Sequence, residues 1–347
     1  MTVEPATRKQ YESTARRFAR WLEARGSDLQ EPDQWVDALQ ALTVGRSRAT
    51  WRLYRHAITW HLRETQGGVI SGRFSLASEG VERPPTKKRP VLRHIEPEVL
   101  DAIVRSLISR RSERARRLAD ILISMVVTGL RPSEFSTARL TDGVVRTLIV
   151  NNAKYAADTA EKPGRGNGPS RELVIDERAS PQIVGAIIRA LDWCHGRDWS
   201  SLAPNANALF RATIKKLVSR REIGSKWQRL RIYDCRHQFS ANAKEHLDLL
   251  AGEVAAAMGH RSVVTAVSHY GRRRFARSGA AMVRPSEKSV ADVSEKSKMR
   301  ALALIQRSEL KRSIAAEDPR ANQVEPTKPA DEPLPTKSSD TNRRSEP

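Results

Sequence analysis

The first 75 residues contain three stretches in which apolar side chains recur every three or four positions. This spacing places those side chains on one face of an α-helix. The first stretch runs from Tyr11 to Leu22, and Gly26 is expected to end it; the second runs from Trp35 to Leu42, and the third from Trp51 to Leu62. The pattern predicts a helical N-terminal domain over residues 1–75.

The periodicity stops between Ser75 and His94, where proline and lysine dominate. Proline stiffens a chain and interrupts regular hydrogen bonding, so residues 76–95 are expected to form an interdomain linker. A plain surface loop is the alternative interpretation.

Residues 96–285 return to helical spacing, interrupted by two β-rich runs at 145–150 and 171–175. A polar loop with Gly164, Gly166 and Gly168 separates the two runs, which predicts a hairpin with a long connection. The predicted helices cover 99–107, the buried apolar run 121–130, 183–193, 209–218, 233–247 and 254–258. The segment is therefore predicted to be a mainly α domain with a small antiparallel sheet.

Apolar content falls away after Pro285. Residues 286–347 are expected to be a largely disordered basic and polar tail, because such a composition cannot bury enough apolar surface to fold. A short amphipathic helix over 299–310 is the one element expected there.

The formal net charge of +21 changes this picture, because it implies a polyanionic partner. Clustered lysine and arginine gain affinity for nucleic acid by releasing phosphate counterions. A membrane partner is not expected, since the N-terminus lacks an apolar signal segment and no stretch is apolar enough to span a bilayer. Cys194 and Cys235 have neither disulfide nor metal spacing, which favours a reducing cytoplasm. Together with the charge, this predicts a cytoplasmic protein associated with DNA.

Two groups of basic residues are candidates for contact with the DNA backbone. One lies beside the third predicted helix, on the side opposite its apolar stripe, and the other lies in the linker. An ordinary solvated face is the alternative for the first group. The candidates are Arg46, Arg48, Arg52, Arg55, Lys87, Lys88 and Arg89.

Five further residues, in a fixed order, are the parts needed to break and rejoin a phosphodiester. They are Arg131, Lys154, Arg236, His260 and Tyr270. A tyrosine supplies the attacking oxygen, and the cations neutralise the charge that builds on phosphorus. Arginine presents a planar fork that matches phosphate oxygens and stays charged. A packed surface aromatic is the alternative for Tyr270, and a buried pair with Glu134 or Asp234 is the alternative for the arginines.

The motifs around these residues resemble those of the tyrosine recombinase (phage integrase) family. Thr128–Glu134 is similar to the first arginine motif of that family, and Tyr233–His237 is similar to its second box. Met258-Gly259-His260, followed by Tyr270, is similar to the third box and nucleophile. The motifs cover roughly 97–277, and the N-terminal helices are more loosely similar to the core-binding domain of the family.

The resemblance implies a C-shaped clamp round double-stranded DNA, formed by the core-binding domain and the catalytic domain. It also implies a homo-oligomer, expected to be a tetramer with four protomers on paired sites, assisted by accessory directionality proteins. Strands would be cut one at a time through a 3′-phosphotyrosyl link, without a metal or nucleotide cofactor. The expected function is integration or excision of a mobile element.

The resemblance also assigns roles at the site. Lys154 would protonate the departing 5′-oxygen, with Lys162 and Arg165 as rivals in the same loop. His260 would hydrogen-bond a phosphate oxygen or help accept the tyrosine proton, unless it is only a helix-cap residue. Glu134 would position Arg131, and His237 would buttress Arg236 or merely pack beside it.

Tyr233 departs from the family pattern, which usually has histidine at this position. Tyrosine can hydrogen-bond a phosphate, but its pKa near 10 makes it a poor base at neutral pH. A type IB topoisomerase shares the tyrosine and its basic set, and a non-catalytic DNA-binding protein could retain the clamp. These two functions are the alternatives to a recombinase.

Overall fold

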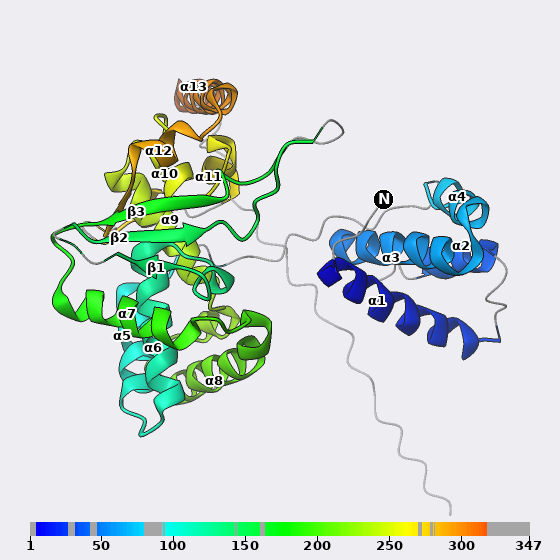
Figure 1. Ribbon diagram of the computed structural model, residues 1–347, viewed down its shortest axis with the longest axis horizontal. Coiled ribbons are helices and arrows are strands. Elements are labelled where there is room, and N and C mark those ends of the chain that lie inside the picture. The colour runs from blue at the N-terminus through cyan, green and yellow to red at the C-terminus, as the bar shows by residue number, and fades with distance from the viewer. Residues whose placement is uncertain are drawn as a thin grey trace, which may run out of the picture. The chain divides into compact units, whose positions relative to one another are not determined.

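The computed structural model separates into two compact units, Met1–Val91 and Leu92–Pro347 (Figure 1). The residues that it describes are 5–26, 32–41, 47–79, 92, 94–141, 143, 145–159, 164–269, 273–277, 280 and 282–317.

The first unit is helical, as predicted. Its apolar stripes meet in one core, in which Phe18, Trp35, Trp51 and Phe74 are buried. Ser47 begins the third helix by accepting a hydrogen bond from the amide of Thr50 at 3.2 Å. The helices are α1 (Pro5–Glu23), α2 (Pro32–Ala41), α3 (Arg48–Gln66) and α4 (Gly68–Ala77).

Helix α4 was not predicted, and its composition explains why. Its apolar residues lie all round the helix, so that Val69 and Leu76 are exposed while Phe74 is buried. Without a single apolar face, no helical period is visible in the sequence. Most of the predicted linker, residues 80–91 and 93, lies outside the described residues, and its bounds stay a prediction.

The second unit combines helices with one small sheet, which confirms the predicted fold class. In Figure 1, helices α5 to α8 lie on one side of the sheet and α10 to α13 on the other. The helices are α5 (Pro97–Ile108), α6 (Glu113–Thr128), α7 (Pro181–Cys194), α8 (Trp199–Ser219), α9 (Asp234–His246), α10 (Glu253–Ala257), α11 (Val263–His269), α12 (Glu287–Ala291) and α13 (Glu295–Glu317), with short 3-10 turns at Pro132–Glu134, Ser225–Arg229 and Arg273–Phe275.

The sheet has four antiparallel strands in the order β1-β2-β3-β4. The predicted hairpin is β2 with β3, and it pairs Leu148 with Leu173. Two short strands that the sequence did not reveal complete the sheet. The strands are β1 (Arg139–Leu140), β2 (Thr147–Asn151), β3 (Ser170–Ile175) and β4 (Val283–Pro285).

Helix α6 forms the centre of the second core. Ile121, Leu122 and Met125 have no exposed surface, in agreement with the apolar run in the sequence. The helix ends because Gly129 adopts a left-handed conformation with φ 69°. A side chain at Gly129 would collide with the ring of Phe239, so glycine alone fits this turn.

The segment after Pro285 corrects the expectation of a disordered tail. Helices α12 and α13 occupy most of 286–317, and Val293 and Ala301 are buried against α10 and α11. Helix α13 is also longer than the predicted 299–310. Its buried residues are small and widely spaced, which hides the docking face in the sequence. Residues 318–347 lie outside the described part of the chain.

Candidate functional site

The centre of the candidate site is Glu134, a carboxylate without exposed surface among three arginines. It accepts hydrogen bonds from the backbone amide of Arg131 at 2.8 Å and from Nη2 of Arg171 at 2.8 Å. Nη1 of Arg131 also donates to it, and Nη1 of Arg236 lies 3.9 Å away. Burial by itself would raise the pKa of Glu134, but Arg171, Arg236 and Arg131 hold that pKa well below its usual range.

Arg131 reaches this carboxylate because of the local chain path. It follows the turn at Gly129 in an extended conformation, and Pro132 then begins a 3-10 turn that ends at Glu134. The two side chains are therefore three residues apart on one turn. Arg131 is 5% exposed, and this small exposed part faces a pocket. Glu134 thus makes the contact that its predicted positioning role requires.

Arg236 lies in the first turn of α9 and is fully buried. Its two terminal nitrogens donate to the backbone carbonyls of Gly129 and Met258, and Nη2 lies 3.5 Å from Nε2 of His260. Arg236 therefore joins the arginine turn to the turn that carries His260. The alternative pair with Asp234 is wrong, because that carboxylate accepts from Arg231 at 2.8 Å.

Arg171 is a site residue that the sequence pattern did not single out. It lies on β3 at an inward position, in alternation with the buried Leu173 and Ile175. Besides Glu134, it donates from Nε to the carbonyl of Ala257 at 3.0 Å and from Nη1 to Asn152. An arginine on the apolar face of a strand needs a buried partner. Its position in the alternating pattern could therefore have indicated a buried ion pair.

These contacts make Arg171 the link between the hairpin and the rest of the site. Asn152 lies just after β2, and Ala257 ends α10. The turn that follows α10 passes close to the Arg171 side chain. A Cβ atom at Gly259, where φ is 62°, would lie 2.7 Å from Nη1 of Arg171. The sequence Met258-Gly259-His260 therefore needs its glycine for the close approach.

His260 follows that turn and is 7% exposed. Burial lowers its pKa well below the usual value, and the nearby charges of Arg236, Arg131 and Arg171 lower it further. The imidazole is therefore neutral at neutral pH, and a ring nitrogen can accept a hydrogen bond.

The low pKa of His260 predicts an acid-sensitive fold. Below pH 6.5 the unfolded chain takes up a proton at this histidine, whereas the folded chain does not. The unfolded state then binds more protons, so the free energy of unfolding falls as the pH is lowered, by up to about 1.4 kcal/mol per pH unit. Urea unfolding at pH 7, 6 and 5 should show a shallower pH slope in His260→Gln than in wild type. Equal slopes would contradict the neutral, buried histidine.

Lys154 lies in the turn just after β2 and is exposed. Arg165 lies across the same hairpin end, where its backbone pairs with that of Ala156. Both side chains line the pocket that Arg131 and His260 also line. Arg165 therefore stays an alternative to Lys154 as the proton donor. Lys162 lies outside the described residues.

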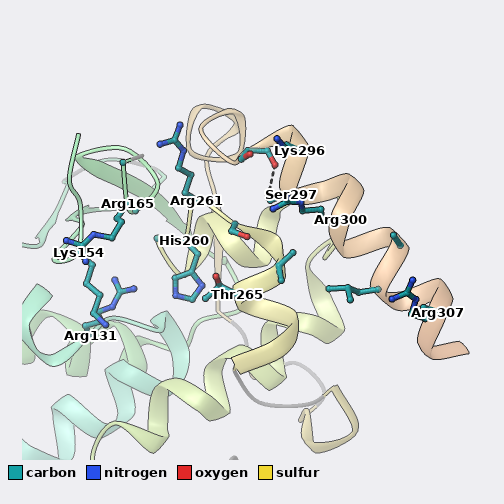
Figure 2. A pocket seen from close by; sticks show the side chains of 18 residues that line it. Arg131, Lys154, Arg165, His260, Arg261, Thr265, Lys296, Ser297, Arg300 and Arg307 are labelled. Atoms are coloured by element: carbon teal, nitrogen blue, oxygen red, sulfur yellow. Dashed lines mark hydrogen bonds between the residues drawn. The ribbon is translucent and has the colours of Figure 1, made fainter. Parts of the chain in front are cut away.

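The pocket has a volume of about 940 Å³ and a cationic lining. Figure 2 shows Arg131, Lys154, Arg165 and His260 on one side of it and side chains of α13 on the other. Among the described residues that line it, none is acidic. Such a pocket is complementary to an anion held against Arg131.

Two residues of the second box lie away from this pocket. Tyr233 is half-buried just before α9, and its ring packs edge-on against His237 with centroids 5.7 Å apart. His237 is therefore in contact with Tyr233, while the Arg236 guanidinium is held by backbone carbonyls. Tyr233 is not among the described residues that line the pocket, and its role at phosphate stays a prediction.

The remaining predicted residues divide into those outside the described chain and those in the first unit. Arg52 is exposed on α3, and Arg48 is half-buried. Arg55 donates to Ser78 at 2.7 Å and to the carbonyl of Ser75 at 3.1 Å, so it joins α3 to the end of α4. The residues outside the described chain are Arg46, Lys87, Lys88, Arg89 and Tyr270. Helix α11 ends at the residue before Tyr270.

Across the described ranges, no cluster of three or more histidine, cysteine or acidic side chains is arranged to hold a metal ion. Within the same ranges, no helix combines the length and the apolar character needed to cross a membrane.

Comparison with known proteins gives only distant structural likenesses. No protein-family model matches the chain, and no curated protein matches it. A XerH site-specific recombinase bound to palindromic difH substrate, in a post-cleavage complex, is 15% identical with a TM-score of 0.40, covering 70% of this chain and 68% of that chain. A pre-cleavage complex of XerH with difH substrate is 14% identical with a TM-score of 0.41, covering 73% and 72%.

Proposed function

We propose that this chain is a tyrosine recombinase, which cuts and rejoins strands of duplex DNA through a 3′-phosphotyrosyl intermediate. One observation carries the proposal. Arg131, Lys154 and His260 come from three distant parts of the sequence and line one cationic pocket, with Arg236 directly behind it. Helix α11 contributes Thr265 to the same pocket and ends just before Tyr270.

Arg131 is the proposed phosphate ligand, because its side chain lines the pocket. Its field, with that of Arg236 behind it, favours the pentavalent transition state over the ground state, since the transition state carries more negative charge. Arg236 would have to exchange a backbone carbonyl for a phosphate oxygen to bind directly. Glu134 accepts a hydrogen bond from Arg131 and lies 3.9 Å from Arg236, and Arg171 in turn donates to Glu134.

Proton transfer in this proposal uses the two other pocket residues. The phenolic oxygen of Tyr270 forms a bond to phosphorus, and the bond from phosphorus to the 5′-oxygen breaks. The phenol proton passes to neutral His260 or to water, and Lys154 donates a proton to the departing oxygen. The energy of the broken ester is kept in the phosphotyrosyl link, so rejoining needs no nucleotide.

The biological setting follows the same proposal. A net charge of +21 suits a protein that binds duplex DNA, with exposed residues such as Arg52 on the DNA backbone. Recombination joins two sites, so several protomers, expected to be four, would act together with accessory directionality proteins. Integration or excision of a mobile element is the proposed task.

Trapping the intermediate tests the function. The full chain would first select bound duplexes from a random library, and each would then be given a nick beside the cut position so that the short 5′-hydroxyl fragment diffuses away. Wild type is expected to form a covalent protein–DNA adduct, and Tyr270→Phe is expected to form none. Absence of an adduct on every selected duplex would refute the enzyme. Supercoil relaxation by monomers, without recombinant product from paired sites, would indicate a topoisomerase instead.

A further inference from the structure

The pocket extends well beyond the reactive residues, along helix α13. Lys296, Arg300 and Arg307 line its far wall (Figure 2). They lie at steps of four and seven residues, which places them on one face of the helix. Ala303 and Leu304 lie between the charges on the same wall and are exposed.

The opposite face of α13 holds the helix in place. Ala301 is buried with Val263 and Val293, and Ser297 accepts a hydrogen bond from the amide of Val263 at 3.1 Å. The amide of Ser294, just before the helix, donates to the carbonyl of Arg261 at 3.0 Å. The basic face is therefore presented to the pocket by a docked helix.

The charges on this face are available to an external anion. Lys296, Arg300 and Arg307 form no ion pair with any described residue. By contrast, the neighbouring Arg261 pairs with Asp158 at 2.8 Å, and Lys298 on another face pairs with Glu295 at 2.6 Å. Three aligned cations without acidic neighbours in the pocket create a strongly positive strip.

The length of the strip indicates the kind of anion. Lys296 and Arg307 are separated by roughly 16 Å along the helix, at 1.5 Å per residue. A single phosphate is far too small to contact both ends. One strand of DNA carries a phosphate about every 3.4 Å along the duplex axis, so a strip of this length matches several consecutive phosphates.

We infer that α13 carries a second phosphate-binding subsite, formed by Lys296, Arg300 and Arg307, which binds the DNA backbone beyond the reactive phosphate. The inference rests on the proposed function for the identity of its ligand. In this arrangement the C-terminal helix binds DNA for its own subunit, and Ala303 and Leu304 face the sugars between phosphates.

The salt dependence of binding tests the subsite without requiring cleavage. The test variant is Lys296→Ala/Arg300→Ala/Arg307→Ala, and the matched control is Arg211→Ala/Lys215→Ala/Lys216→Ala on exposed positions of α8. Both remove three positive charges from the second unit. Each full-length chain is titrated into a fluorescein-labelled mixed-sequence duplex over a series of salt concentrations.

The slope of log K against log salt is expected to become shallower by about 2.7 in the α13 variant, because each neutralised phosphate contributes about 0.9 to the slope. Between about 50 and 200 mM salt, this makes the drop in affinity roughly 40-fold smaller than in wild type. The control is expected to keep the wild-type slope. A difference between the two variants of less than about 1 in slope would overturn the subsite, since it would leave total charge, or a ligand other than DNA, as the explanation.

Failure of this inference is distinguishable from failure of the proposed function. If the slope changes in the α13 variant but wild type forms no covalent adduct, α13 binds DNA and the proposed cleavage is refuted. If wild type forms the adduct but the slope is unchanged in the α13 variant, the enzyme stands and the subsite is refuted.

Discussion

Glu134→Gln is expected to lower the free energy of unfolding of the second unit by about 3–5 kcal/mol, because it leaves buried positive charge without its counter-charge. Glu134 has no exposed surface and is in contact with Arg131 and Arg171, with Arg236 close by. Glutamine keeps the shape of the side chain, removes the charge and replaces one accepting oxygen by an NH2 donor. Calorimetry of the full chain would measure the change in the transition of this unit.

The matched control is Glu96→Gln. Glu96 pairs with Lys226 at 2.7 Å, but the side chains of Lys226 and Glu96 are 60% and 43% exposed. Solvent screens such a pair, so its removal is expected to cost less than about 1 kcal/mol. A similar small decrease in both variants would show that the buried arginines do not depend on Glu134.

A double variant isolates the cause of the effect. Arg171→Met alone removes a partner of Glu134 and is destabilising. In the Glu134→Gln background the same change removes an uncompensated buried charge, so it should cost much less or even stabilise. Additive decreases would contradict direct coupling of the two side chains.

Arg131→Ala is expected to reduce the rate of adduct formation by at least roughly 10²–10³, the cost of removing one donor to the charge that develops in a transition state. DNA binding should change little, since most phosphate contacts of the proposal lie elsewhere. Single-turnover cleavage on the nicked substrate, together with titration of the same duplex, measures both quantities. If the affinity for DNA and the rate of cleavage fall by the same factor, Arg131 contributes to binding and not to the transition state.

A change in the leaving group provides the control for this prediction. Sulfur in place of the bridging 5′-oxygen leaves as a thiolate, which needs no proton donor. Such a substrate should restore cleavage by Lys154→Ala but not by Arg131→Ala. If the sulfur-containing substrate restores cleavage by Arg165→Ala instead, Arg165 is the proton donor of the hairpin.

Local patterns in the sequence were sufficient for most of the fold. Helix α6 was visible as the apolar run 121–130, and the β2–β3 hairpin was visible from its two β-rich runs. The contact between Arg131 and Glu134 could also be predicted from a local pattern, since the two residues are only three positions apart. Helix α4 was missed because its apolar residues surround the helix.

Contacts between distant segments were not accessible in this way. Arg171 approaches Glu134 only because the sheet packs against the arginine turn, and Arg236 reaches the carbonyls of Gly129 and Met258 across two other elements. The docking of α13 depends on a few small residues, of which Ala301 is one. A single sequence records the residue types in these contacts but not their partners.

The identity of the residue joined to DNA decides whether Tyr270 is the nucleophile. The chain has five tyrosines, and Tyr155 is an exposed neighbour of Lys154 in the hairpin. Adduct formed by wild type would be digested with nuclease and protease, and the nucleotide-bearing peptide would be sequenced by mass spectrometry. We expect a nucleotide attached to Tyr270 through a 3′-phosphate. Attachment at Tyr155, Tyr233 or any other residue would contradict it.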